Sequence, residues 1–237
     1  MKKMIRGAAL SAAACSIVMA GGYKIPEQSL NSMGLGAAYV AHTEGADSNY
    51  YNPANMSFMA DEKHYVEGGV TLASLPAITY SLGDPYSGKS ESENILIPYF
   101  HYVSEAYGDF RWGVSLTAPG GLTKRWNSPA QKAYAEEFTL KIVELNPSLS
   151  YRINDQLSIA GGLRLIYSEG VVKSDGAGMS AIIGNPQANV ARDMEGDTIE
   201  FGYNLALTYK PTSDINMAVT YRSNVDLDEE GTATLSA

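Results

Sequence analysis

The side chains that most often carry out chemistry in proteins are few in this sequence and form no reactive set. The three histidines, His42, His64 and His101, have no serine and acidic residue in an arrangement that supports nucleophilic catalysis. Cys15 is the only cysteine, and no group of His, Cys, Asp and Glu has the spacing of metal ligands. We therefore expect no enzyme activity, no metal and no cofactor.

Charged residues recur at polar positions of otherwise apolar, alternating segments. Arg164 and Arg222 are our candidates for a ligand contact, because an arginine holds a carboxylate through paired N–H donors. The alternative is a network of salt bridges with no role in ligand binding. Pairing of Ile153 with Leu157 across a short turn would place Glu144 diagonal to Arg164. The whole set is Glu67, Arg111, Glu144, Arg152, Arg164, Glu200 and Arg222.

The segments that position these charges read as β-strands. Apolar and polar residues alternate with period two, so that one face meets an apolar phase and the other face meets water. We count seven such strands: His64–Ala73, Ile95–Ser104, Phe110–Ala118, Leu145–Ile153, Leu157–Tyr167, Ile199–Tyr209 and Ile215–Tyr221. The polar stretch from Gly231 to Ala237 is not predicted to be a strand.

The connections between these strands alternate in length. Those at 105–109, 154–156 and 210–214 are short, whereas those at 74–94, 119–138 and 170–197 are long. Short turns on one side and long loops on the other are typical of outer-membrane β-barrels. Because single-chain barrels of bacteria close with an even number of strands, we expect this chain to be the N-terminal part of a larger barrel.

The N-terminus has the features of a secretory signal peptide. Lys2, Lys3 and Arg6 precede an uncharged run that ends in Val18-Met19-Ala20, a small-x-Ala cleavage site. Residues 1–20 are therefore predicted to be removed, which leaves 14 basic and 26 acidic residues. That acidic balance argues against a nucleic-acid partner, since phosphate binding requires clustered Lys and Arg.

Residues 21–60 do not alternate and are rich in Gly, Ala, Ser and Asn. Their motifs, and two in the strands that follow, are Gly34-Leu35-Gly36-Ala37-Ala38, Gly45-Ala46-Asp47, Asn52-Pro53-Ala54, Trp112-Gly113-Val114 and Ala118-Pro119-Gly120-Gly121-Leu122. In this order and spacing the chain resembles the FadL family of outer-membrane fatty acid transporters, which includes the TodX-type hydrocarbon channels. The loop at 170–197 looks shorter than in the best-known transporter.

The resemblance implies an all-β transmembrane barrel of about fourteen strands. Residues 21–60 would form a hatch inside it, and residues 61–237 would form its N-terminal portion. It also implies a sideways exit through the wall, beside Asn52, Pro53 and Ala54 and next to a kinked third strand. Gly113 lies in that strand and Pro98 in its neighbour. Neither residue favours regular hydrogen bonding between strands. Both are therefore our candidates for the weak seam, the place where the two strands would separate.

The long loops offer a surface where an apolar ligand would be captured. Leu122, Trp126, Tyr134 and Phe138 are apolar for a loop outside the membrane, and the next loop carries Met179 and residues 181–183. Exposed apolar patches usually mark binding, although these residues would equally well fold back onto the barrel rim. Ser128 and Pro129 are suited to start a helix over residues 130–138.

The function that this pattern favours is uptake of long-chain fatty acids or other apolar molecules across the outer membrane of a Gram-negative bacterium. The alternative is a non-specific porin, and an outer-membrane lipid hydrolase is less favoured. We expect a monomer, in contact with outer-membrane lipid.

We predict that the mature protein begins at Gly21 and partitions into the outer membrane, because Val18-Met19-Ala20 ends a short uncharged run. N-terminal Edman sequencing of protein extracted from outer membranes should start at Gly21, and the band should be heat-modifiable on gels. A soluble product, or one that starts at Met1, would contradict export.

Overall fold

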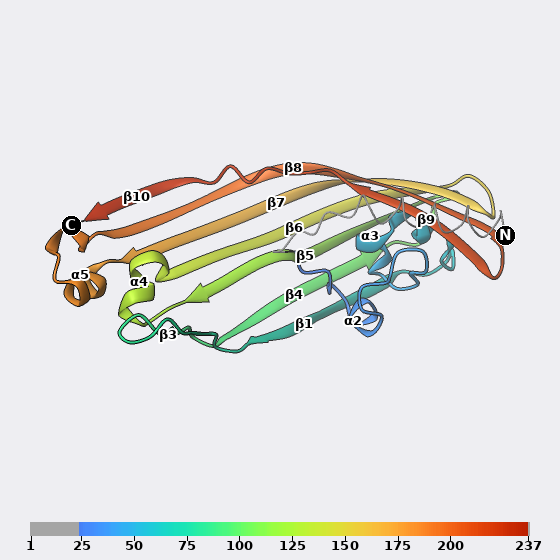
Figure 1. Cartoon of the computed structure of the whole chain (residues 1–237). Coiled ribbons are helices and arrows are strands. Elements are labelled where there is room, and N and C mark those ends of the chain that lie inside the picture. The colour runs from blue at the N-terminus through green and yellow to red at the C-terminus, as the bar shows by residue number, and fades with distance from the viewer. Residues whose placement is uncertain (1–23, 237) are drawn as a thin grey trace, which may run out of the picture.

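The computed structural model describes residues 24–236, so the predicted signal peptide lies outside the described residues. Figure 1 shows long strands lying side by side in one curved sheet. Within residues 24–236, no helix combines the length and hydropathy needed to cross a membrane.

The main sheet is antiparallel throughout. Its first six positions are taken by β1 (Tyr65–Leu75), β4 (Glu93–Val103), β5 (Phe110–Arg125), β6 (Glu137–Arg152), β7 (Leu157–Asp175) and β8 (Ala191–Thr212). β9 (Ile215–Arg222) and β10 (Glu230–Ser236) both pair with β8, one after the other along its length. They share the seventh position, so the prediction of seven antiparallel positions is confirmed.

Smaller elements lie between the long strands. The segment before β1 contains α2 (Leu30–Gly34), α3 (Ser48–Tyr51) and η1 (Pro53–Phe58). The three long connections contain β2 (Thr79–Tyr80) and β3 (Gly88–Lys89), then α4 (Pro129–Ala135), then α5 (Ala177–Ile183) and η2 (Pro186–Ala188). α4 begins at the predicted proline but ends before Phe138, which belongs to β6. The end of the sheet that carries α4 and α5 is called the loop end, and the opposite end the turn end.

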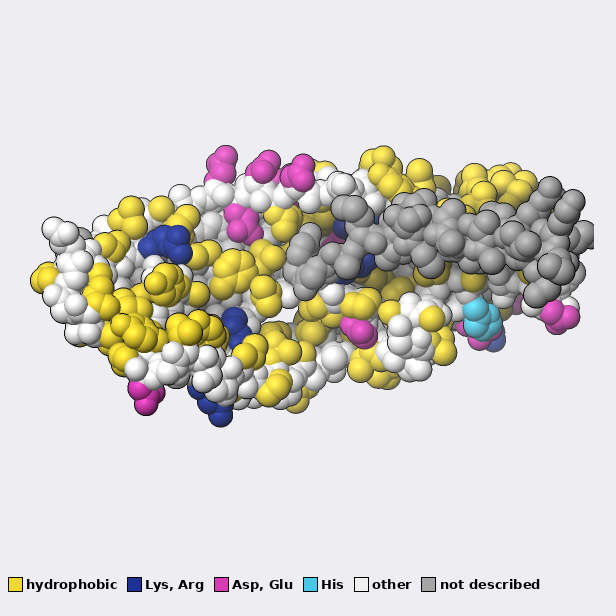
Figure 2. Space-filling view, viewed as in Figure 1, with side chains coloured by type: hydrophobic (Ala, Val, Ile, Leu, Met, Phe, Trp, Pro, Cys, Tyr) yellow, Lys and Arg dark blue, Asp and Glu magenta, His cyan; other side chains and the backbone are white. Residues whose placement is uncertain are grey.

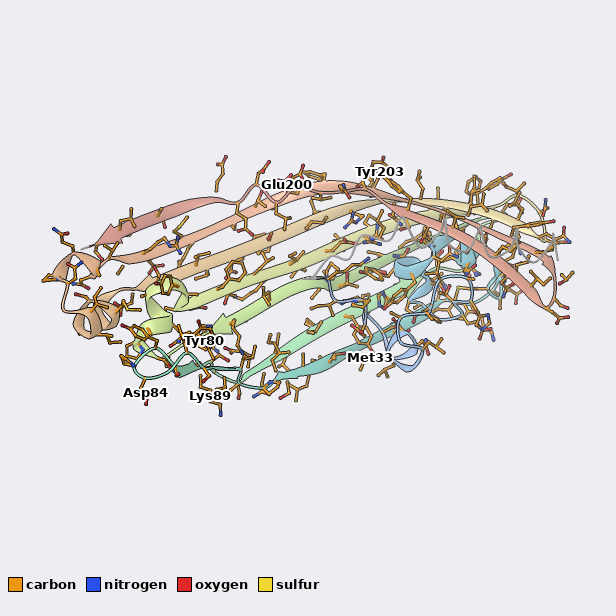
Figure 3. The ribbon with its side chains drawn as sticks, in the orientation of Figure 1. Met33, Tyr80, Asp84, Lys89, Glu200 and Tyr203 are labelled. Atoms are coloured by element: carbon orange, nitrogen blue, oxygen red, sulfur yellow. The ribbon has the colours of Figure 1, made fainter. Side chains whose placement is uncertain are left out.

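The alternation seen in the sequence separates an apolar outer face from a polar inner face. On the outer face Leu149 is 50% exposed and Phe201 is 76% exposed, and Figure 3 shows Tyr203 on this side of β8. On the inner face Ser150 and Ser158 are completely buried. A water-soluble sheet would bury its apolar face, so this inverted pattern fits a wall whose outer face meets lipid.

The strands are longer at the loop end than the sequence predicts, and much of 119–138 and 170–197 is strand and not loop. In this part the outer face carries charged pairs between strands. Lys141 Nζ lies 2.9 Å from Glu169 Oε1, and Lys173 Nζ lies 2.8 Å from Glu195 Oε1. The inner face here carries apolar side chains such as Phe138, Leu140 and Ile142, so the alternation is opposite in phase to that of the lipid-facing part of the strands.

The polar stretch from Gly231 to Ser236, which was not expected to form a strand, belongs to β10 and pairs with the loop end of β8. Ala233 lies opposite Met194, and Leu235 lies opposite Arg192. The part of β8 that pairs with β10 carries charged residues such as Arg192, Asp193 and Glu195. The side chains of β10 are mostly Thr and Ala, so no apolar alternation marks this strand in the sequence.

The segment from residue 24 to residue 60, called the N-terminal segment, docks on the polar inner face through hydrogen bonds. Arg111 donates to Met56 O at 2.8 Å and to Ala60 O at 2.7 Å, and Asn49 Nδ2 donates to Asn146 O at 2.9 Å. Polar groups removed from water must be bonded in this way, so each contact ties the segment to the wall.

Within the N-terminal segment, the phenol of Tyr39 donates to Asp47 Oδ1 at 3.2 Å. Burial raises the pKa of Tyr39 to about 12, so the phenol keeps its proton and remains a donor at neutral pH. Asn31 Nδ2 donates to the other carboxylate oxygen of Asp47 at 3.1 Å. Asp47 is thus held by two neutral donors from its own segment.

We predict that deleting residues 21–60 raises the single-channel conductance of the full-length protein in planar bilayers. The N-terminal segment covers the inner face, so its loss would open the lumen to ions. An unchanged conductance, in a variant that still shows heat-modifiable migration, would contradict a segment that fills the lumen.

Candidate functional site

The wall is interrupted between β4 and β5. These strands pair only where Phe100–Val103 faces Gly113–Leu116. By contrast, β5 pairs with β6 from Phe110 to Arg125, with one register shift between Thr117 and Gly120. Towards the loop end the two sides meet again, where Glu91 N donates to Arg125 O at 2.9 Å. The unpaired stretch, residues 93–99 of β4 and 117–124 of β5, is called the wall break.

Prolines explain part of this interruption. Pro98 lies in the β4 side of the wall break, and Pro119 lies at the register shift of β5. Pro98 cannot donate to a ladder, so a regular β4–β5 pairing would lack a donor there, and Pro119 coincides with the register shift of β5 against β6. The sequence suggested Pro98, but it assigned Pro119 to a loop because the strand beyond it was not recognised.

Gly113 lies outside the wall break, since it pairs with Val103. A Cβ atom at this position would meet Asn49 Oδ1 at 2.6 Å and Met56 Sδ at 2.9 Å. Gly113 therefore has a different role from the one predicted. Because it has no side chain, the N-terminal segment can approach β5 closely.

The start of the N-terminal segment runs along the β5 side of the wall break. Ile25 N donates to Pro119 O at 2.8 Å, and Lys24 forms an isolated antiparallel bridge with Gly120. The side chain of Gln28 bonds to Ala118. Sequence reasoning missed these residues, because their partners lie far along the chain and no motif marks them.

The Asn52-Pro53-Ala54 turn is docked on other strands. Asn52 Nδ2 donates to Thr208 Oγ1 of β8 at 2.8 Å, and Ser158 Oγ of β7 donates to Ala54 O at 2.7 Å. Asn52 Oδ1 also accepts from Ala54 N at 3.2 Å and so caps η1. The described hydrogen bonds of this turn anchor the N-terminal segment to the wall, and a part in a lateral exit stays a prediction.

An apolar cavity of about 810 Å³ lies at the loop end. Figure 2 shows hydrophobic side chains gathered at this end of the molecule, and Figure 3 shows Tyr80 beside α4. Of the predicted capture residues, Trp126 and Tyr134 line the cavity, whereas Leu122 and Phe138 lie on β5 and β6 and are not among its lining residues. Its large apolar side chains are Tyr80, Leu82, Tyr86, Trp126, Tyr134, Met179 and Ile183.

Inside the sheet, Glu144 is the centre of a charged cluster. Its carboxylate is completely buried and accepts from Arg164 at 2.8 and 3.0 Å, and also from Arg222. Arg222 lies over the ring of Tyr50, 4.6 Å from its centroid. The diagonal placement of Glu144 and Arg164 is as the sequence predicts, since Ile153 N bonds to Leu157 O. Both arginines are thus in the salt-bridge network that was the alternative to a ligand contact.

The cluster has more positive than negative charge nearby. Burial lowers the pKa of the Lys24 ammonium, and the guanidinium groups of Arg222 and Arg164 lower it further. Within the described part of the chain, no group of three or more His, Cys, Asp and Glu side chains is placed to hold a metal ion.

Residues 11–237 match the family model described as "Outer membrane protein transport protein (OMPP1/FadL/TodX)". The chain is 26% identical over 234 residues to the long-chain fatty acid transport protein of Escherichia coli O6:H1, covering 89% of this chain and 52% of the relative. It is 21% identical to outer membrane protein P1 of Haemophilus influenzae, covering 84% and 53%.

Two solved structures share the fold. A Pseudomonas aeruginosa FadL homologue has a TM-score of 0.69 at 18% identity, covering 91% of this chain and 55% of the other. The Pseudomonas putida toluene transporter TodX has a TM-score of 0.62 at 18% identity, covering 83% and 55%. The predicted β-barrel fold is thereby confirmed. The chain spans about half the length of the curated relatives it matches.

We predict that Glu144→Gln lowers the free energy of unfolding of the full-length protein by roughly 3–5 kcal/mol, because two largely buried guanidinium groups lose their carboxylate. A urea titration in lipid vesicles measures this. Glu169→Gln is the matched control, since its pair with Lys141 is exposed and should contribute less than about 1 kcal/mol. Equal effects of the two substitutions would contradict a buried cluster.

Proposed function

Because the chain belongs to the OMPP1/FadL/TodX family of outer-membrane transport proteins, we propose that the complete protein takes up long-chain fatty acids or other apolar molecules. The family consists of transport proteins of the Gram-negative outer membrane, so the predicted family, location and lack of enzyme activity are confirmed. The relatives' names give long-chain fatty acids and toluene as cargo, and both are hydrophobic.

The observation that supports this proposal best is the short pairing of β4 with β5. We propose that cargo leaves sideways through the wall break into the membrane. An alkyl chain gains about 0.8 kcal/mol for each CH₂ group that moves from water into an apolar phase, so a route into lipid suits it better than a wet axial pore. Leu96, on the β4 side, is 67% exposed and offers the leaving chain an apolar surface.

Capture begins at the loop end in this proposal. The cavity there is large enough for part of an alkyl chain or for an aromatic ring, and Trp126 and Tyr134 supply flat apolar surfaces. Its residues come from all three long connections, so the cavity depends on how these connections pack together. Leu122 lies on β5 and Phe138 on β6, outside the lining of the cavity, and both remain proposed contacts for passing cargo.

A carboxylate head group would meet positively charged side chains on the inner face of the sheet. Arg164 and Arg222 already bind Glu144, so we propose that they contact a head group only through N–H groups that face away from Glu144. Lys24 is close enough to this cluster for both arginines to lower the pKa of its ammonium group. It also forms a β-bridge with Gly120 in the wall break. The proposed head-group site therefore lies next to the proposed exit at the wall break.

We further propose that residues 21–60 act as a hatch in the closed barrel, with Asn52, Pro53 and Ala54 as an anchor. A non-specific porin is the alternative, and the inner face does carry the polar side chains of a wet lumen. The hydrogen bonds of the N-terminal segment across that face favour a filled lumen. The protein is expected to act as a monomer in contact with outer-membrane lipid, without nucleic acid.

We predict that oleate with a photoreactive diazirine near its methyl end crosslinks to the wall break of the full-length protein. Cells that take up the probe would be irradiated, and the modified peptides mapped by mass spectrometry. Labels on residues 93–99 or 117–124 are expected, and excess unlabelled oleate should remove them. Labelling confined to residues 41–44 and 210–216, at the turn end, would indicate an axial route instead.

A further inference from the structure

Gln28 bonds to the wall break in the way that a strand residue would. Its side chain is completely buried. Nε2 donates to Ala118 O at 2.9 Å, and Oε1 accepts from Ala118 N at 3.1 Å. One donor and one acceptor on a planar amide are what a backbone residue of a neighbouring strand offers. The side chain thus replaces, at Ala118, the pairing that β4 does not supply.

The backbone of Gln28 is held as firmly as its side chain. Its N–H donates to the phenol oxygen of Tyr51 at 2.7 Å. Its carbonyl accepts from His101 Nε2 at 2.8 Å, so Nε2 carries the ring proton. The other ring nitrogen, Nδ1, then accepts from Ser115 Oγ at 2.8 Å. His101 belongs to β4 and Ala118 to β5, and Gln28 therefore joins both strands that border the wall break.

We propose that Gln28 is the positioning residue that keeps the wall break closed, as a removable substitute for one strand residue. This rests on the proposed lateral exit. Ladder bonds between long strands break cooperatively, whereas a side-chain amide is withdrawn by rotation about its own bonds. Its release frees the N–H and O of Ala118 and the carbonyl of Ile25, to which Nε2 also donates at 3.1 Å, so the cost of opening is small and local.

The chemistry of the side chain accounts for the residue type. Glutamate has no N–H to give Ala118 O, and methionine fills the same space with neither donor nor acceptor. Asparagine is one methylene shorter, so its amide would not span the distance that Gln28 covers from an unchanged backbone. Gln28→Met therefore removes both bonds to Ala118 while keeping the packing.

The test compares Gln28→Met with Gln156→Met in the full-length protein. Gln156 is an exposed turn residue and serves as the control. Three quantities are measured: amide exchange at Ala118 by NMR in nanodiscs, single-channel conductance, and uptake of labelled oleate by cells. For Gln28→Met we expect exchange at Ala118 to rise on the order of tenfold. Oleate uptake should rise severalfold, with wild-type conductance, and the control should match wild type throughout.

Each other outcome decides a different point. Unchanged exchange at Ala118 would overturn the substitute-strand role of Gln28. Faster exchange together with raised conductance would mean that Gln28 only holds the N-terminal segment in place, which also overturns it as a local closure. Faster exchange with wild-type conductance and uptake would show that the wall break opens but carries no cargo. That last result would remove the lateral exit of the proposed function, and with it the gating role of Gln28.

Discussion

Lipid offers no partners for backbone N–H and C=O groups, and this constraint governs the whole arrangement. Every strand in a membrane-facing wall must pair along its length or receive hydrogen bonds from elsewhere. Between β4 and β5 the pairing covers only Phe100–Val103 and Gly113–Leu116. Ile25 and Gln28 bond to Pro119 and Ala118 on the unpaired side. The N-terminal segment is therefore part of the wall as well as an occupant of the inner face.

The same constraint places polar chemistry inside. The buried contacts of the inner face are made mainly by Ser, Asn, Thr and Arg side chains, beside small apolar clusters such as Ala54 with Ala160 and Ala206. The N-terminal segment is held there by directional hydrogen bonds, such as Asn52 to Thr208 and Arg111 to Met56 O. Such bonds are exchanged with water at modest net cost, whereas an apolar core resists separation. A segment held by such bonds suits a transporter in which passing cargo must displace some contacts between the segment and the wall.

The sequence predicts the lipid-facing part of the wall well, and for a physical reason. Lipid requires apolar residues such as Leu149 and Phe201 at alternate positions, and short turns fix the pairing, so that even the Glu144–Arg164 contact follows. Beyond the lipid band the outer face is polar, as at Lys141 and Lys173, so the strand ends at Arg125, Asp175 and Ala191 lack the lipid-facing signal. Gln28 and Ala118 lie 90 positions apart and show no local pattern, so only the folded chain brings them together.

We propose that this wall passes apolar molecules while its lumen stays closed to polar ones. The most direct measurement uses the full-length protein in liposomes, with sugar-driven swelling and the transfer of labelled oleate followed in the same preparation. Oleate transfer should accelerate, and small sugars should not enter the liposomes. Rapid swelling in sugars, at protein densities where a porin swells liposomes, would contradict this proposal.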